Sequence, residues 1–208
     1  MPAQNDPLKR VVINLESAHW GETNDWPSPY GGYYYVAGGA ATGPLPGSKC
    51  QGYRSKMIST SYGSVIVGSR VFNDVVHAQD FIELAFVFRT TRIADPQYFD
   101  HTRGTVIDAL TAHIGTAIRE LTTPVPGSVA AAILAATPVA LVGAREAADD
   151  DVVLGMVQKT VTLADYPDGS YPLNWRFTNK IPMHGAKSGW SEWDFEIEHS
   201  MQVEPCQS

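Results

Sequence analysis

Acidic side chains gather in three stretches rich in turn-forming residues, and each stretch borders a predicted strand. The stretches contain Glu22, Asn24 and Asp25, then Asp149, Asp150 and Asp151, and last Asp165 and Asp168. Calcium binds roughly six to eight oxygen atoms from carboxylates, amides and carbonyls. Loops at one end of a rigid scaffold can bring such groups together from distant positions. We therefore expect calcium as a cofactor, bound by Glu22, Asp25, Asp149, Asp150 and Asp151, with solvated acidic loops as the alternative.

Aromatic residues surround the first of these acidic stretches. Trp20, Trp26 and Tyr30 are the candidates for ligand contact, because Trp and Tyr combine a flat apolar ring with a polar group. In an exposed loop they could stack on a sugar or lie at a membrane interface. The alternative is that they fill the end of a hydrophobic core.

Other common chemistries have no signature in this sequence. The six histidines never take the spacing of a zinc site, and there is no G-x-S-x-G nucleophile motif. Cys50 and Cys206 could form one disulfide, although two free thiols are the favoured interpretation. His199 falls on the apolar side of a predicted strand, where a hydrogen-bonded core histidine is expected. We predict that the chain has no catalytic residues and is not an enzyme.

Charge and composition narrow the class of partner. The net charge of −7 disfavours nucleic acid, because affinity for a phosphate backbone comes largely from Lys and Arg. The first residues have neither a basic segment nor an apolar segment, so they do not resemble a signal peptide. We expect a cytoplasmic protein or one exported by a non-classical route.

Alternating apolar residues predict the strands that would position these groups. The pattern is clearest at residues 8–18 and at residues 190–203, where His199 is the only interruption of the apolar face. Residues 81–92 instead begin with a run that is apolar except for Glu83, which predicts a mostly buried strand. Seven or eight strands separated by turn signals, without alternating helices, favour an antiparallel β-sandwich. We predict one domain over residues 1–208.

One long stretch, residues 103–147, lacks strand signals and is predicted to be an α-helical insertion in this sandwich. Its first half has an apolar stripe at helical spacing, for which Thr102 is the expected N-cap. Its second half is rich in Ala and Val and is broken by Pro126 and Pro138. The apolar run is shorter than the roughly 20 residues that cross a bilayer. We expect a buried hairpin that covers the sheet, or else a segment that inserts at a membrane or at an oligomer interface.

Two segments resemble a known class of protein. Residues 12–36 (VINLESAHWGETNDWPSPYGGYYYV) and residues 149–162 (DDDVVLGMVQKTVT) are similar to the corresponding strands and loops of uncharacterised microbial C2-like β-sandwich proteins. The resemblance implies a C2-like sandwich that is linked to calcium and to membranes.

These observations lead to one functional expectation and two alternatives. The expectation is a non-enzymatic C2-like sandwich that acts at a membrane or partner surface, possesses a calcium site, and has a toxin-like or defence-related role. The first alternative is an assembly subunit that forms a homo-oligomer through the Ala-rich insertion. The second is a carbohydrate-binding module that uses Trp20, Trp26 and Tyr30.

Overall fold

The computed structural model describes residues 7–22, 33–43, 49–58, 64–91, 96–146, 151–182 and 190–206. Eight strands, two helices and one short 3-10 turn lie in these ranges. In chain order they are β1 (Leu8–Glu22), β2 (Tyr33–Gly43), β3 (Cys50–Arg54), β4 (Ser64–His77), β5 (Phe81–Thr91), α1 (Pro96–Arg119), α2 (Ser128–Gly143), β6 (Val152–Thr162), η1 (Leu163–Asp165), β7 (Gly169–Pro182) and β8 (Trp190–Pro205).

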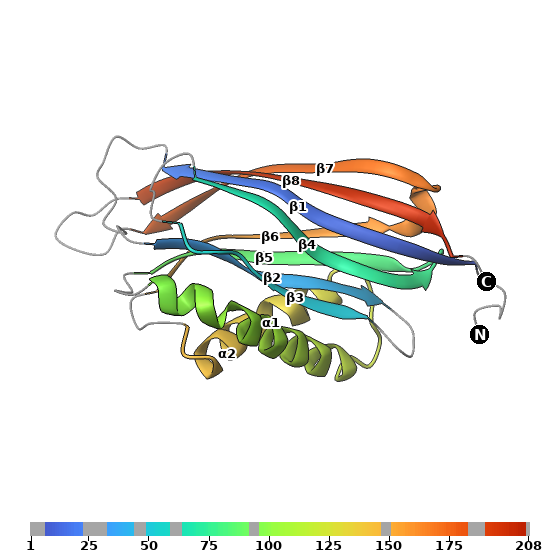
Figure 1. Cartoon of the computed structure of the whole chain (residues 1–208), viewed down its shortest axis with the longest axis horizontal. Helices are drawn as coiled ribbons and strands as arrows, with labels where there is room; N and C mark the ends of the chain where they lie inside the picture. Colours follow the sequence, from blue (N-terminus) through green and yellow to red (C-terminus); the bar gives the residue numbers. More distant parts are fainter. Residues whose placement is uncertain are drawn as a thin grey trace.

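The strands form two antiparallel four-stranded sheets that pack face to face. The first sheet has the order β4-β1-β8-β7, and the second has the order β3-β2-β5-β6. Figure 1 shows a third layer, because α1 and α2 lie together against the outer face of the second sheet. The predicted antiparallel β-sandwich with a helical insertion is confirmed.

The helical layer explains why two central strands are apolar along their whole length. All eleven residues of β5 are buried, and so are all those of β2 after its first residue. One face of these strands packs in the sandwich core, and the other packs under the helices, so neither face is solvated. Strand β8 is covered on one face only, and its burial alternates residue by residue.

Strand β1 runs four residues further than its sequence pattern predicts, and a bulge changes which residues it buries. Val11, Ile13 and Leu15 face the core. The pairing with β8 shifts between Leu15 and Ser17, and beyond this point Ala18 and Trp20 are buried instead. A bulge adds one residue to a strand and so reverses its alternation. Trp20 therefore lies in the core.

The insertion differs from its prediction at both helices. Helix α1 begins at Pro96, a residue suited to a first helical position, so Thr102 lies inside the helix and the N-cap prediction is wrong. The Thr102 hydroxyl oxygen instead lies 3.1 Å from the carbonyl oxygens of Tyr98 and Phe99 in the preceding turn. Helix α2 contains Pro138 and continues to Gly143.

Helix α1 also covers the free edge of the second sheet. The Gly52 amide of β3 donates to the Thr111 hydroxyl at 2.8 Å, which gives an edge N–H group a partner. Cys50, in the same strand, contacts the Thr111 carbonyl at 3.5 Å. Cys50 and Cys206 are both free thiols.

Candidate functional site

The structure describes the side chain of one of the five predicted calcium ligands. Asp25, Asp149 and Asp150 lie outside the described residues, and Glu22 is described only as the last residue of β1. Asp151 accepts a hydrogen bond from the Tyr35 hydroxyl at 2.9 Å. It also lies 3.4 Å from a guanidinium nitrogen of Arg89.

Asp151 therefore has a structural role that its sequence context did not indicate. Its side chain is 1% exposed, and it links the start of β6 to β2 and β5. Within the described ranges, no three His, Cys, Asp or Glu side chains are grouped as metal ligands. The calcium site stays a prediction, because three of its five expected ligands lie outside those ranges.

The predicted ligand-contacting aromatics are also only partly described. Trp26 and Tyr30 lie outside the described residues. Trp20 is 2% exposed and packs against Tyr34 and Phe88, with ring centroids 6.1 and 5.7 Å away. Its ring faces have no room to stack on a ligand.

A buried carboxylate attaches the N-terminal end of α2 to the second sheet. Glu83 of β5 is 1% exposed. It accepts hydrogen bonds from the amides of Gly127 and Ala130, at 2.8 and 2.5 Å, and from the Thr160 hydroxyl at 2.5 Å. Free amides and the helix dipole make a helix N-terminus favourable for an anion. The single Glu in an otherwise apolar stretch was the sequence signal for this contact.

The C-terminal end of α2 is attached by a buried arginine. Arg54 Nε of β3 lies 2.8 Å from Glu146 Oε2, and Arg54 Nη1 lies 3.5 Å from Asp100 Oδ1 near the start of α1. The guanidinium also lies over the rings of Tyr35 and Phe99, at 5.6 and 5.7 Å. This one side chain thus joins both ends of the insertion to the sheet.

Two opposing effects act on the pKa of the Glu146 carboxyl. Burial raises the pKa of the Glu146 carboxyl, while Arg54 and the hydroxyl of Thr102 oppose this rise. The Thr102 hydroxyl donates to Glu146 Oε1 at 3.1 Å. Removing one partner of such a buried ion pair leaves an unpaired buried charge and strongly destabilises the protein. The Arg54–Glu146 pair therefore holds the insertion in position on the sheet.

The anchored helix α2 presents an apolar surface to solvent. Its exposed residues are Ala131, Ala135, Pro138, Val139, Val142 and Gly143. Val139 and Val142 are 56% and 64% exposed. Helix α1, in contrast, exposes charged and polar residues such as Asp108 and Arg119. A surface helix normally has a polar outer face, so α2 departs from the expected pattern.

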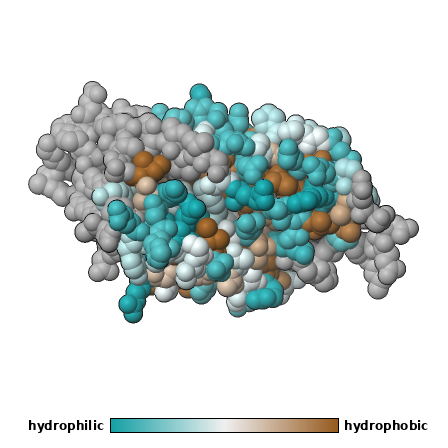
Figure 2. Space-filling view, viewed as in Figure 1, coloured by the Kyte–Doolittle hydropathy of each residue, from teal (hydrophilic) through white to brown (hydrophobic). Residues whose placement is uncertain are grey.

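Strand β6 also exposes apolar side chains on the outer face of the second sheet. Val87 of β5 packs in one cluster with Leu141 of α2, and Met156 lies opposite Val87 in the β5–β6 pairing. Met156 therefore shares the face that α2 covers, yet it is 59% exposed, and Val153 is 39% exposed. We call α2's exposed residues, together with Val153 and Met156, the apolar surface. On the face drawn in Figure 2, by comparison, hydrophobic residues form only small groups among hydrophilic ones.

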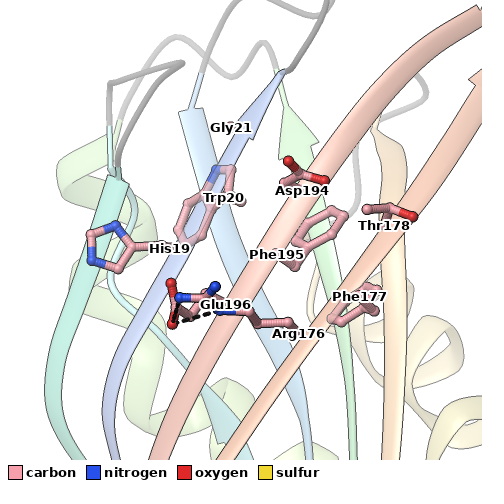
Figure 3. A pocket seen from close by; sticks show the side chains of 9 residues that line it. All are labelled: His19, Trp20, Gly21, Arg176, Phe177, Thr178, Asp194, Phe195 and Glu196. Carbon is pink, nitrogen blue, oxygen red and sulfur yellow. Dashed lines mark hydrogen bonds and ion pairs between the residues drawn. The ribbon is translucent and has the colours of Figure 1, made fainter.

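A second feature lies on the outer face of the first sheet, where β1, β8 and β7 run side by side. A hollow of about 560 Å³ lies there, and Figure 3 shows the residues that line it. Its lining residues are His19, Trp20, Gly21, Arg176, Phe177, Thr178, Asp194, Phe195 and Glu196. The strand register sets His19, Glu196 and Arg176 in one row. The alternation of residues along a strand can show that they face outward, but it does not show where the sheet is hollowed.

Neither described helix is both long enough and apolar enough to cross a membrane. Comparison with models of known protein families and with curated protein sequences found no match.

Proposed function

We propose that this chain is a non-catalytic assembly subunit that self-associates through the apolar surface of α2. The observation that carries the proposal is the composition of that surface. Every residue that α2 exposes is Ala, Pro, Val or Gly. Large exposed apolar patches mark interaction sites on proteins, and this one lies on an element rich in small residues.

A second copy of the chain is the occupant that fits this surface. The exposed face of α2 has no charged side chain, so two copies meet there without like-charge repulsion despite the net charge of −7. Ala131 and Ala135 also allow two helix backbones to approach closely. A two-fold interface of this type uses the same patch on both subunits.

The size of the surface sets the expected strength of association. Helix α2 has 16 residues and so spans about 24 Å. Stable interfaces bury roughly 800 Å² on each partner, which is more than one helix face offers. Val153 and Met156 add to the contact area on β6. We therefore expect a reversible dimer whose population depends on concentration.

The rigid attachment of α2 supports this role. Glu83 anchors one end and the Arg54–Glu146 pair anchors the other. A surface that is already in its bound conformation loses little entropy on association.

The test is light scattering on the full chain over a range of concentrations. The wild type is expected to gain mass with concentration, and the double variant Val139→Lys/Val142→Lys is expected to stay monomeric. Ala112→Lys is the matched control, because it adds a Lys to the exposed side of α1. A wild type that remains monomeric overturns the proposal. Binding of that monomer to phosphatidylcholine vesicles would assign the apolar surface to membranes instead.

A further inference from the structure

The hollow on the first sheet is formed around a missing side chain. Gly21 of β1 lies opposite Asp194 of β8, and Asp194 lies opposite Thr178 of β7. A Cβ atom added to Gly21 would have no neighbouring atom within 4 Å. The residues on either side of this gap, in Figure 3, come from three adjacent strands. A volume of about 560 Å³ falls within the roughly 300–1,000 Å³ of small-molecule sites.

The hollow contains hydrogen-bond acceptors with unused capacity. Arg176 directs Nε and Nη2 to the same oxygen of Glu196, at 2.9 and 2.5 Å, so Glu196 Oε2 is left without a contact from this arginine. In the described part of the chain, no ion pair or hydrogen bond engages the Asp194 carboxylate. The Thr178 hydroxyl is exposed beside it and can both donate and accept.

Donors line the same hollow. Arg176 contributes the guanidinium nitrogen that Glu196 does not engage, and the imidazole of His19 is exposed. The Trp20 indole offers no further donor, because it lies on the core side of the sheet against Tyr34 and Phe88.

The mixture of donors and acceptors selects a class of ligand. A cation would use Asp194 and Glu196 and would leave the Arg176 donor unused. An anion would meet the carboxylate of Asp194, which no described cation neutralises. A hydroxyl group donates and accepts at once, so adjacent hydroxyls can satisfy both kinds of partner.

We propose that this hollow binds a neutral, polyhydroxylated ligand, namely the sugar ring of a carbohydrate. The site is independent of the assembly surface, because it lies on the first sheet, and α2 lies beyond the second sheet (Figure 1). It also differs from a site formed by Trp20, Trp26 and Tyr30, because here polar groups of β1, β7 and β8 make the contacts.

The experiment is a titration of the full chain, followed by backbone amide NMR, with glucose, galactose, mannose, fucose and N-acetylglucosamine. Methylammonium serves as the cation probe. We expect saturable shifts for at least one sugar at residues 19–21, 176–178 and 194–196. Gly21→Val fills the gap and is expected to abolish binding, and Asp194→Asn is expected to weaken it about tenfold, as for the loss of one charged hydrogen bond.

Glu204→Gln is the matched control, because it makes the same type of change at an exposed position of β8 outside the hollow. It should bind sugar as the wild type does. The proposal is overturned if no sugar shifts these residues, if methylammonium does so in their place, or if Gly21→Val binds normally. None of these results depends on whether α2 self-associates.

Discussion

His199 is a buried titratable side chain without a hydrogen-bond partner among the described residues. It is 2% exposed and lies against Trp175 and Phe86, with ring centroids 4.6 and 5.8 Å away. Burial lowers the pKa of the imidazole to about 3. The expectation of a core histidine is thus confirmed for burial, while neither ring nitrogen has a described hydrogen-bond partner.

This pKa gives a prediction with a definite sign. The folded-state pKa of His199 lies below the unfolded value of about 6.5. The unfolded chain therefore takes up the proton first, and stability falls as the pH drops from about 6.5 towards 3. At pH 5 the loss should be about 2 kcal/mol relative to pH 8. Urea unfolding of wild type and His199→Leu tests this, because the variant should lack that part of the decline. Parallel pH profiles would contradict it.

Glu83 is the residue whose removal should loosen the insertion. Glu83→Gln keeps the shape of the side chain and removes the charge that faces two amides of the α2 N-terminus. We expect the free energy of unfolding to fall by about 1–3 kcal/mol, as for a buried hydrogen bond to a charged group. Urea denaturation measures the loss. The exposed change Glu204→Gln should leave stability the same, and equal effects of the two changes would refute the anchoring role.

At the scale of the element, α2 ends in a turn in which one non-glycine residue adopts an unfavourable backbone conformation. Arg145 has φ of 58°, in the left-handed region. Its amide donates to the Val142 carbonyl at 3.0 Å, and the next amide, of Glu146, donates to the Leu141 carbonyl at 2.9 Å. These are the two hydrogen bonds of a Schellman motif, in which this position is usually Gly. The turn matters because it directs Glu146 towards Arg54.

Replacing Arg145 with Gly should therefore stabilise the protein. The left-handed conformation costs an ordinary residue roughly 1–2 kcal/mol, part of which the greater backbone freedom of Gly in the unfolded chain offsets. We expect a net gain of about 0.5–1 kcal/mol, seen as a higher Tm by calorimetry. An unchanged or lower Tm would show that the Arg145 side chain makes a compensating contact.

The elements also show what a sequence pattern can and cannot predict. Strand β8 was predictable because only one of its faces is buried, which gives a strict alternation. The face of β1 on which Trp20 lies was not predictable, because the bulge in β1 depends on the pairing with β8 and leaves no local signal in the sequence. Buried charges such as Glu83 could be detected as exceptions in an apolar strand, but their partners come from α2, far along the chain.

At the scale of the whole molecule, the third layer determines how the chain meets its surroundings. The helices cover β2 and β5, so the second sheet contributes little open surface except along β6. That sheet therefore meets solvent mainly through the helices. The first sheet keeps an open outer face with a polar hollow. The two candidate surfaces thus lie on opposite sides of the sandwich (Figure 1).

The sequence predicted this architecture better than it predicted the sites. The spacing of apolar residues and the positions of turn residues identify strands and helices, because each of these elements depends on residues close together in the chain. The hollow and the apolar surface depend instead on how distant elements pack. Val139 and Val142 were expected within a buried hairpin, and only the placement of α1 and the sheet shows which side of α2 stays exposed.

The central claim is that α2 meets its own copy, and cysteine cross-linking tests it most directly. Ala135 lies near the middle of α2, where a two-fold axis would bring two copies together. In a Cys50→Ser/Cys206→Ser background, Ala135→Cys should form a disulfide-linked dimer under mild oxidation, because a disulfide needs Cα atoms within about 7 Å. Ala112→Cys, on the exposed side of α1, should not. Equal cross-linking of the two variants, or none in Ala135→Cys, would contradict self-association through α2.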